Sequence, residues 1–430
     1  MQRDLLHQLI EWGKNPAKKP LILRGARQVG KSWIVREYAK QFESFVEINF
    51  EKEKKAKMWF EGDLDVASLI NTISLYKDKK ITAGTTLLFF DEVQECENAL
   101  RALRYFKEEL PKLHVIAAGS LLDFAIDKIG LPVGRIQFLH LYPLSFNEFL
   151  TALGHDDLRQ YIAKKQNEMT LHEKLLDLLK TYMWLGGLPE VVNQWIKTRD
   201  PRICQSVQDD IIETYMQDFH KYAKDRQIPY VSMLFERIPL LIGKKFKFSN
   251  IDPDIKSGVL KESLSLLQKA GIAYYCYHSA AQGQPLGSMI DLKKFKVFLF
   301  DIGITQRLMG LDIKQWLLQP VKLNNIGAIA EQLVAQELMA YSSAHKHAQL
   351  YYWHRESASS SAEVDFVIIK KGEIIPIEVK SSSQGALRSM HLFLENHKDS
   401  PYGLKISENL FSRYNNIHEV PLYAINVALS

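Results

Sequence analysis

Residues 25–32 read Gly25-Ala-Arg-Gln-Val-Gly-Lys-Ser32 and fit the pattern GxxxxGK(S/T). In such a loop the glycines let backbone N–H groups turn toward phosphate oxygens. A strand is expected before it, at Pro20–Arg24, and a helix after it, at Lys31–Phe42, whose N-terminus adds partial positive charge. The segment therefore predicts a nucleotide site in which Lys31 reaches the β- and γ-phosphates and the Ser32 hydroxyl binds Mg²⁺. The residues assigned to nucleotide contact are Gly25, Ala26, Arg27, Gln28, Val29, Gly30, Lys31 and Ser32.

An acidic pair at the end of a nearby apolar strand supplies the second half of the predicted site. In the string Leu87-Leu-Phe-Phe-Asp-Glu92, Asp91 would hold the Mg²⁺ shell and Glu92 would orient the attacking water. Strands often end in surface acids, so this string alone does not indicate a metal site. It does so here because the phosphate loop lies about 60 residues earlier. ATP and Mg²⁺ are therefore the predicted cofactors.

For three further residues of this region, the sequence does not decide between a catalytic and a structural role. Ser120, just after the expected strand His114–Ala118, could orient water or cap a helix N-terminus. Arg135 could act on the γ-phosphate, in its own chain or in a neighbouring subunit, or it could form a surface salt bridge. Arg27, inside the loop, could likewise act on the phosphates or form a surface salt bridge.

The pattern changes several times along the chain, and 430 residues exceed what one hydrophobic core organises. In residues 1–150, short apolar runs alternate with helical patterns, which predicts βαβ units and a parallel sheet. A helical lid is expected at 151–224, and a helix pair followed by apolar strands, the outline of a winged helix, at 225–320. With an α/β region at 321–430, the predicted fold class is multidomain α/β.

Composition excludes several classes of protein. Hydrophobic residues make up 46% and charged residues 24%, as in an ordinary folded chain, and the formal net charge is only +5. The three cysteines are far apart, so neither a disulfide framework nor a zinc knuckle is indicated. No apolar run approaches the roughly 18 residues of a membrane helix, and the N-terminus lacks an uninterrupted apolar signal segment. We therefore expect a cytoplasmic protein without a membrane partner.

Acidic and basic residues gather again near the C-terminal end. Glu363–Ile369 is expected to form one strand, and Pro376–Lys380 lies on the next strand, after a short turn. Because side chains alternate along a strand, Glu378 and Lys380 share one face, and a hairpin can bring Asp365 beside them. Two carboxylates can hold a divalent metal, and a nearby lysine can help to deprotonate a water, as phosphodiester hydrolysis requires.

Two other interpretations of this cluster stay open. The groups could form the solvated face of an antiparallel sheet, with cross-strand ion pairs. The fold could also be that of a nuclease without activity, retained for binding a partner.

The middle region carries lysines such as Lys244 and Lys256 beside aromatic residues. This combination indicates a surface for the backbone of nucleic acid, since basic side chains make most phosphate contacts. The alternative is a packing module whose lysines are merely solvated.

Several strings in the first half of the chain resemble AAA-type ATPases of bacteria and archaea that carry a DUF4143 domain. The strings are Leu21–Ser32, Phe90–Gln94, Ala118–Ser120, Gly134–Arg135, Leu141–Phe149 and Gly186–Val192. The resemblance implies a P-loop ATPase core, a helical and winged-helix middle, and a C-terminal domain similar to PD-(D/E)xK nucleases, which have the restriction-endonuclease-like fold. It also implies that Glu331, on a helix packed against the strands, joins Asp365 and Glu378 as a metal ligand. Ring-shaped homo-oligomers are common among AAA-type ATPases.

Two functions follow as alternatives. In the first, ATP binding licenses metal-dependent cleavage of DNA or RNA at Asp365, Glu378 and Lys380. In the second, the nucleotide state controls which partner an idle C-terminal domain holds. Nucleic acid, a protein partner and a second copy of the chain are thus the partners considered.

Overall fold

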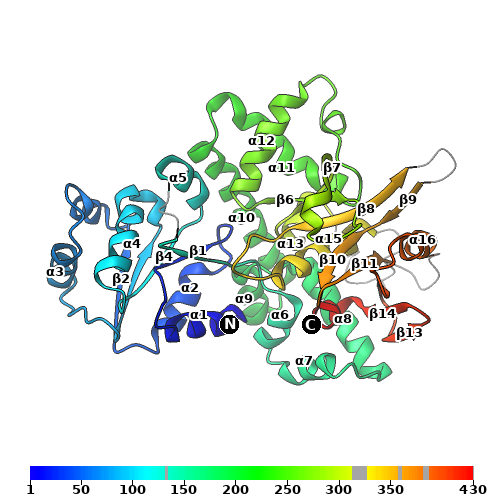
Figure 1. Cartoon of the computed structure of the whole chain (residues 1–430), viewed down its shortest axis with the longest axis horizontal. Coiled ribbons are helices and arrows are strands. Elements are labelled where there is room, and N and C mark those ends of the chain that lie inside the picture. Colours follow the sequence, from blue (N-terminus) through cyan, green and yellow to red (C-terminus); the bar gives the residue numbers. More distant parts are fainter. Residues whose placement is uncertain (131–133, 312–326, 357–360, 381–386, 430) are drawn as a thin grey trace. The chain divides into compact units, whose positions relative to one another are not determined.

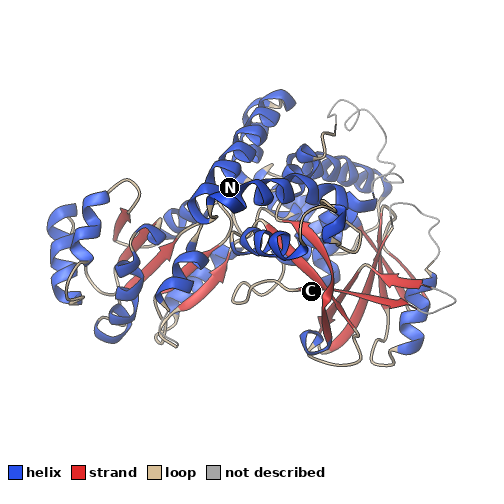
Figure 2. Cartoon of the chain, turned by 90° about the horizontal axis from the view of Figure 1, so that it is seen from above, coloured by secondary structure: helices blue, strands red, loops and turns tan. Residues whose placement is uncertain are grey.

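The computed structural model describes residues 1–130, 134–311, 327–356, 361–380 and 387–429 (Figure 1, Figure 2). The chain forms two compact units. The amino-terminal unit comprises Gln2–Tyr142 and Ser343–His347, and the carboxy-terminal unit comprises Pro143–Ser342 and Ala348–Ser430, with Met1. The domain boundary predicted between residues 320 and 321 lies outside the described residues.

A five-stranded parallel sheet forms the centre of the amino-terminal unit, with the strand order β2-β3-β4-β1-β5. The strands are β1 (Leu21–Arg24), β2 (Ser44–Asn49), β3 (Thr86–Asp91), β4 (His114–Ala118) and β5 (Gln137–His140). The α-helices described here are α1 (Leu5–Lys14), α2 (Lys31–Ala39), α3 (Val66–Lys77), α4 (Glu97–Glu109) and α5 (Leu122–Ile129). The parallel α/β core predicted from the sequence is therefore confirmed.

Burial on both faces holds this sheet together. Every residue of β3 and β4 is buried, as the continuous apolar runs of these strands require. The rings of Phe50, Phe60 and Phe106 surround Phe90 in tilted and edge-to-face contacts. Because β3, β4 and β1 are parallel neighbours, their carboxyl ends and the loops that follow them meet at one edge of the sheet.

Helices open the carboxy-terminal unit, as the sequence predicted. They are α6 (Phe146–Ala152), α7 (Asp156–Ala163), α8 (Met169–Leu185), α9 (Pro189–Thr198), α10 (Pro201–Tyr222), α11 (Ile228–Arg237) and α12 (Ser257–Lys269). A capping box formed by Ser145 and Glu148 begins α6. The buried Glu337 carboxylate accepts hydrogen bonds from Phe146 N (2.9 Å) and the Tyr182 hydroxyl (3.2 Å). This carboxylate therefore fixes the start of α6 against α8.

Two sheets follow the helices. The first has the order β7-β6-β8-β9, formed by β6 (Ala273–Ser279), β7 (Ile290–Leu299), β8 (Leu350–Glu356) and β9 (Ser361–Val364). The second has the order β10-β11-β12-β14-β13, formed by β10 (Phe366–Lys370), β11 (Glu373–Val379), β12 (Gly403–Ser407), β13 (Ser412–Tyr414) and β14 (Ile417–Pro421). The helices described beside them are α13 (Ile302–Leu308), α15 (Gly327–Ala340), α16 (Arg388–Asn396) and α17 (Ile425–Leu429).

The expected hairpin is present as the antiparallel strands β6 and β7. The helix pair was expected within residues 248–270, but that segment contains one α-helix, α12, after a short 3-10 turn. However, β6 also pairs in parallel with β8, so the hairpin is part of a larger sheet. The winged-helix description of this region stays a prediction.

The structure corrects one predicted strand. The segment Glu363–Ile369 is not continuous, because β9 ends at Val364 and pairs with β8, whereas β10 begins at Phe366 and pairs with β11. Asp365 lies in the bend between them, and its Oδ2 accepts a hydrogen bond from the Val379 N–H over 2.8 Å. The side chain thus satisfies a buried backbone donor where the chain passes from one sheet to the other.

Two glycines after α8 allow a close approach to α13. Gly187 N donates to the buried Asp301 carboxylate over 2.7 Å, and this carboxylate also caps α13. A side chain at Gly186 would meet the Asp301 carboxylate at 2.2 Å, and one at Gly303 would meet the Leu185 carbonyl oxygen at 2.3 Å. Only residues without a Cβ fit this contact.

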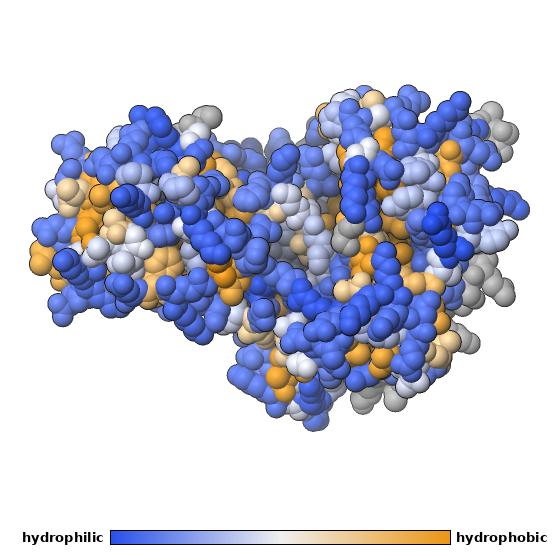
Figure 3. Space-filling view, turned by 60° about the horizontal axis from the view of Figure 1, so that its bottom comes forward, coloured by the Kyte–Doolittle hydropathy of each residue, from blue (hydrophilic) through white to orange (hydrophobic). Residues whose placement is uncertain are grey.

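The surface shown in Figure 3 is mostly hydrophilic, with small, scattered apolar patches, as is usual for a folded protein. Within the described residues, no helix is both long enough and apolar enough to cross a membrane.

Gly303→Ala should destabilise the carboxy-terminal unit by about 1–3 kcal/mol, because the new methyl group would overlap backbone atoms. Gly258→Ala is the matched control, since a methyl group there meets nothing within 4 Å. This control should leave stability unchanged or raise it by up to about 1 kcal/mol. Denaturant unfolding measures both changes, and equal midpoints would contradict the packing described for α8 and α13.

Candidate functional site

The loop between β1 and α2 has the backbone of a phosphate cradle. Gly25 (φ 148°) and Gly30 (φ 96°) have conformations that residues with side chains rarely adopt. A Cβ on Gly25 would lie 2.2 Å from the Leu141 carbonyl oxygen, so no other residue fits there without movement. Gly30 is the N-cap of α2, so the first N–H groups of that helix face the loop.

Lys31 lies buried under this loop. Its Nζ donates to the carbonyl oxygens of Gly25 (2.9 Å) and Ala26 (2.7 Å). Burial lowers the pKa of the Lys31 amine to about 8, although the carboxylates of Glu92 and Asp91 act in the opposite direction. The amine is therefore held by weak neutral acceptors, which a phosphate group can replace.

The structure brings the two predicted halves of the site together. The Ser32 Oγ lies 2.9 Å and 3.0 Å from the two carboxylate oxygens of Asp91. Asn49, paired in register with Asp91 across β2 and β3, donates its side-chain amide to the same carboxylate over 3.1 Å. Hydroxyl and carboxylate oxygens are the ligands that Mg²⁺ prefers, so this pair fits the ion. Sequence reasoning missed Asn49; its signal was its place at the end of a strand beside β3.

Glu92 is held in position by Gln94. Glu92 has a left-handed backbone (φ 49°), and its Oε2 accepts a hydrogen bond from Gln94 Nε2 over 2.6 Å. A Cβ on Gly119 would lie 2.0 Å from Gln94 Oε1, so Gln94 also packs against the end of β4. Gln94 was not assigned a role from the sequence, although it lies in the string Phe90–Gln94.

The remaining predicted residues of this unit lie as follows. Ser120 is partly buried just after β4, and the N-cap position of α5 belongs to Leu121, so the helix-capping alternative is not observed. Arg135 is exposed and pairs with Glu108 over 3.2 Å, as the surface salt-bridge alternative predicted. Arg27 is partly buried within the loop. Catalytic roles for these three residues stay predictions.

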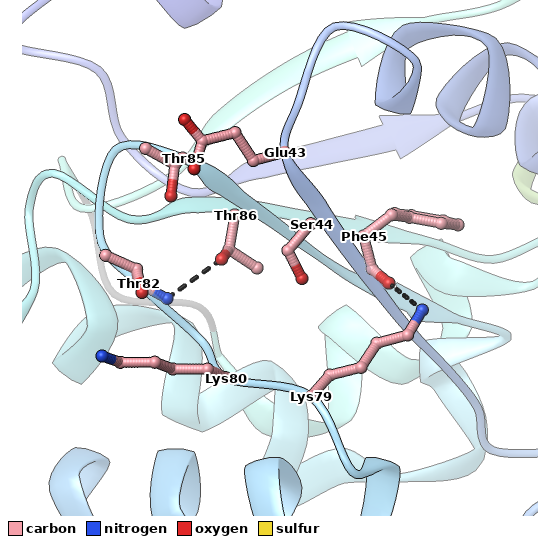
Figure 4. A pocket seen from close by; sticks show the side chains of 8 residues that line it. All are labelled: Glu43, Ser44, Phe45, Lys79, Lys80, Thr82, Thr85 and Thr86. Carbon is pink, nitrogen blue, oxygen red and sulfur yellow. Dashed lines mark hydrogen bonds between the residues drawn. The ribbon is translucent and has the colours of Figure 1, made fainter.

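A separate pocket of about 480 Å³ opens at the other end of the sheet (Figure 4). Ser44 and Thr86, the first residues of β2 and β3, line it together with Lys79 and Lys80. Lys79 Nζ donates to the Phe45 carbonyl oxygen over 3.0 Å. Asp91 lies at the opposite end of β3, so this pocket is not the nucleotide site.

In the carboxy-terminal unit, four acids and two lysines form a second group, here called the acid cluster. Its members are Glu331 of α15, Glu363 of β9, Asp365, Glu378 of β11, Lys296 of β7 and Lys380. The Lys296 side chain is 0% exposed, and its Nζ lies 2.7 Å from Glu363, 3.1 Å from Glu331 and 3.7 Å from Asp365. Lys296 was not assigned a role from the sequence. The available signal was one lysine inside the apolar run Phe295–Phe300.

The structure brings together the four predicted residues Glu331, Asp365, Glu378 and Lys380. Lys380 Nζ lies 2.6 Å from Glu378 Oε1. The other oxygen of Glu378 is buried and has no hydrogen-bond partner among the described residues. Both oxygens of Asp365 have partners, since Oδ2 accepts from Val379 N and Oδ1 faces Lys296.

The acid cluster holds more acids than lysines in a buried space, and the pKa values of three of its acids are raised. Burial and the neighbouring Asp365 raise the pKa of Glu331 to about 8 and that of Glu378 to about 7. Burial also raises the pKa of Asp365. Burial by itself would lower the pKa of Lys296, but the surrounding carboxylates outweigh it and raise that pKa well above the ordinary value. The surrounding carboxylates thus favour the charged form of Lys296.

The acid cluster does not fit a divalent metal at the predicted ligands. Glu331 and Asp365 each direct an oxygen at the Lys296 ammonium, and an ion bound within about 2.1 Å of these oxygens would have to take its place. Among the predicted ligands, only Glu378 has a buried oxygen without a hydrogen-bond partner in the described residues, and one such oxygen does not make a magnesium site. In the part of the chain that is described, no group of three or more His, Cys, Asp or Glu residues has metal-binding geometry.

Family models match three segments of the chain. Residues 17–150 match an AAA domain (AAA_14), residues 176–315 a domain of unknown function (DUF8612), and residues 326–425 another (DUF4143). No curated protein matches the chain in sequence. The chain thus combines an AAA domain with a DUF4143 domain, and the predicted resemblance is confirmed.

Three solved structures are similar to this chain. A Walker-type ATPase of Pyrococcus abyssi is 16% identical, with 71% of this chain and 94% of that chain covered and a TM-score of 0.45. A signal-transduction ATPase with numerous domains and a tetratricopeptide-repeat sensor, from Pyrococcus horikoshii, is 12% identical, with 77% and 44% covered and a TM-score of 0.29. Drosophila ORC bound to DNA is 13% identical, with 72% and 85% covered and a TM-score of 0.25.

Gln94→Ala should lower ATP turnover about 10-fold or more while nucleotide affinity stays near that of the wild type, because Glu92 loses the group that orients it. Gln160→Ala, an exposed glutamine of α7, is the matched control and should change neither quantity. Phosphate release and calorimetric binding measure the two effects. A Gln94→Ala protein with full turnover would show that Glu92 does not depend on this contact.

Proposed function

We propose that the amino-terminal unit binds ATP with Mg²⁺ and hydrolyses its terminal phosphoanhydride bond. The observation that carries this proposal is the contact of the Ser32 hydroxyl with both oxygens of Asp91 at the end of β3. In P-loop enzymes this pair of residues holds the metal, and here it adjoins Lys31. The match of residues 17–150 to an AAA domain supports the same assignment.

Each residue has a separate task in this proposal. The N-terminus of α2 and the N–H groups of the loop would bind the phosphates, and Lys31 would exchange its carbonyl partners for the β- and γ-phosphates. Ser32 and Asp91 would hold Mg²⁺, which supplies neutralisation of the phosphate charge. Glu92, oriented by Gln94, would position the attacking water.

Lys31→Ala should lower ATP turnover at least about 100-fold, because the charge that develops on the phosphate loses its cation. Glu92→Gln should still bind ATP while turnover falls about 100-fold. Lys40→Ala and Glu97→Gln, at exposed positions, are the matched controls. Phosphate release tests turnover and calorimetry tests binding. Normal hydrolysis by Lys31→Ala would overturn the proposal.

For the carboxy-terminal unit we propose the second function considered above, a catalytically idle module whose partner depends on the nucleotide state. The observation in favour is the Lys296 ammonium among the carboxylates that metal-dependent cleavage would use. Nucleic acid remains a candidate partner, through exposed lysines of the α12 region such as Lys256 and Lys261. A protein partner is the other candidate.

Incubation of the full-length protein with single- and double-stranded DNA and RNA separates the two functions. Mg²⁺ or Mn²⁺ is present, ATP is added or left out, and an Asp365→Ala/Lys380→Ala double variant is the control. The proposal predicts ATP hydrolysis without cleavage of any substrate. Cleavage by the wild type that the double variant lacks would establish an ATP-coupled nuclease instead.

A further inference from the structure

We propose that the Lys296 ammonium is the built-in cation of the acid cluster and stands where a divalent metal would otherwise bind. Glu331 lies on α15, Glu363 on β9 and Asp365 in the bend just after β9, and each directs an oxygen at the same nitrogen. This convergence on one point is the arrangement that carboxylates adopt around a metal ion, here with an ammonium group at the centre.

The surroundings of Lys296 suit a compact ammonium. The ring of Tyr352 lies 5.5 Å from Nζ, close enough for a cation–π contact. A Cβ on Gly243 would lie 2.9 Å from Glu331 Oε1, so the backbone closes the cluster on that side. Mg²⁺ usually keeps several bound waters, and a site closed by backbone and an aromatic ring leaves little space for them.

The charges of the cluster depend on one another. A buried ammonium or carboxylate is strongly unfavourable by itself and becomes tolerable only when paired. Lys296 lies on β7, Glu363 on β9 and Glu331 on α15, so the ion pairs connect a helix to both edges of one sheet. Removal of the ammonium would leave three acids without their shared cation.

The cation and the acids belong to different segments of the chain. Lys296 lies in the segment that matches DUF8612, and all four acids lie in the segment that matches DUF4143. Lys296, the residue that excludes a metal, therefore lies outside the segment that matches DUF4143. The sequence pattern of the acids is that of a metal site. Lys296 from the preceding segment forms ion pairs with them instead.

Divalent-cation binding to Lys296→Met tests this inference. The experiment uses full-length, nucleotide-free protein in an Asp91→Asn background, so that the nucleotide site contributes no metal. Mn²⁺ is the probe, with calorimetry for stoichiometry and thermal unfolding for stability. Lys293→Met, an exposed lysine on the same strand, is the matched control. Lys296→Met/Glu331→Gln removes one acid together with the cation.

The inference predicts that the background protein and Lys293→Met bind no Mn²⁺ at the cluster. Lys296→Met should melt at lower temperature in metal-free buffer, bind one Mn²⁺, and regain at least about 3 °C with saturating Mn²⁺. The double variant should melt above Lys296→Met and bind Mn²⁺ more weakly. If the single variant does not fold, a folded double variant and a background protein without Mn²⁺ support the inference.

Two results would overturn it. The first is one Mn²⁺ bound by the background protein and lost on Asp365→Asn, which would make the cluster a metal site beside Lys296. The second is a Lys296→Met protein with unchanged melting and no Mn²⁺, which would mean that the cluster needs no cation. Neither result bears on ATP hydrolysis, so this inference and the proposed ATPase activity can fail independently.

Discussion

The parallel pairing of β1 and β3 with β4 between them is the constraint on which the nucleotide site depends. It brings the loop after β1 and the acid at the end of β3 to the same edge of the sheet. The contact between the Ser32 hydroxyl and Asp91 is the direct result. Every residue of β3 and β4 is buried, so packing on both faces of these central strands holds their carboxyl ends in place.

The nucleotide site could be predicted from sequence where its chemistry is local. The loop glycines, Lys31 and Asp91 follow from a short pattern and from strands that read as apolar runs. Asn49 and Gln94 could not be found in this way, since their importance comes from strand register and from a contact with Glu92. For the same reason the break at Asp365 was missed, because it depends on a hydrogen bond to Val379 in another strand.

The acid cluster shows a second limit of sequence reasoning. Asp365, Glu378 and Lys380 lie near one another as expected, but residue types that build a metal site also build a buried network of ion pairs. The deciding residue is Lys296, which lies in a different segment of the chain and was assigned no role in the chemistry. A lysine inside an apolar strand indicates a buried partner of opposite charge, because an unpaired ammonium is rarely buried.

Calorimetric titration with ATP, with and without Mg²⁺, tests the central claim most directly when wild type and Asp91→Asn are compared. Asp78→Asn, at an exposed position of the same unit, is the control. The account predicts that Mg²⁺ tightens ATP binding at least about 10-fold, or about 1.4 kcal/mol, in the wild type and the control, and that Asp91→Asn loses this gain. Equal affinity in all three proteins, independent of Mg²⁺, would contradict it.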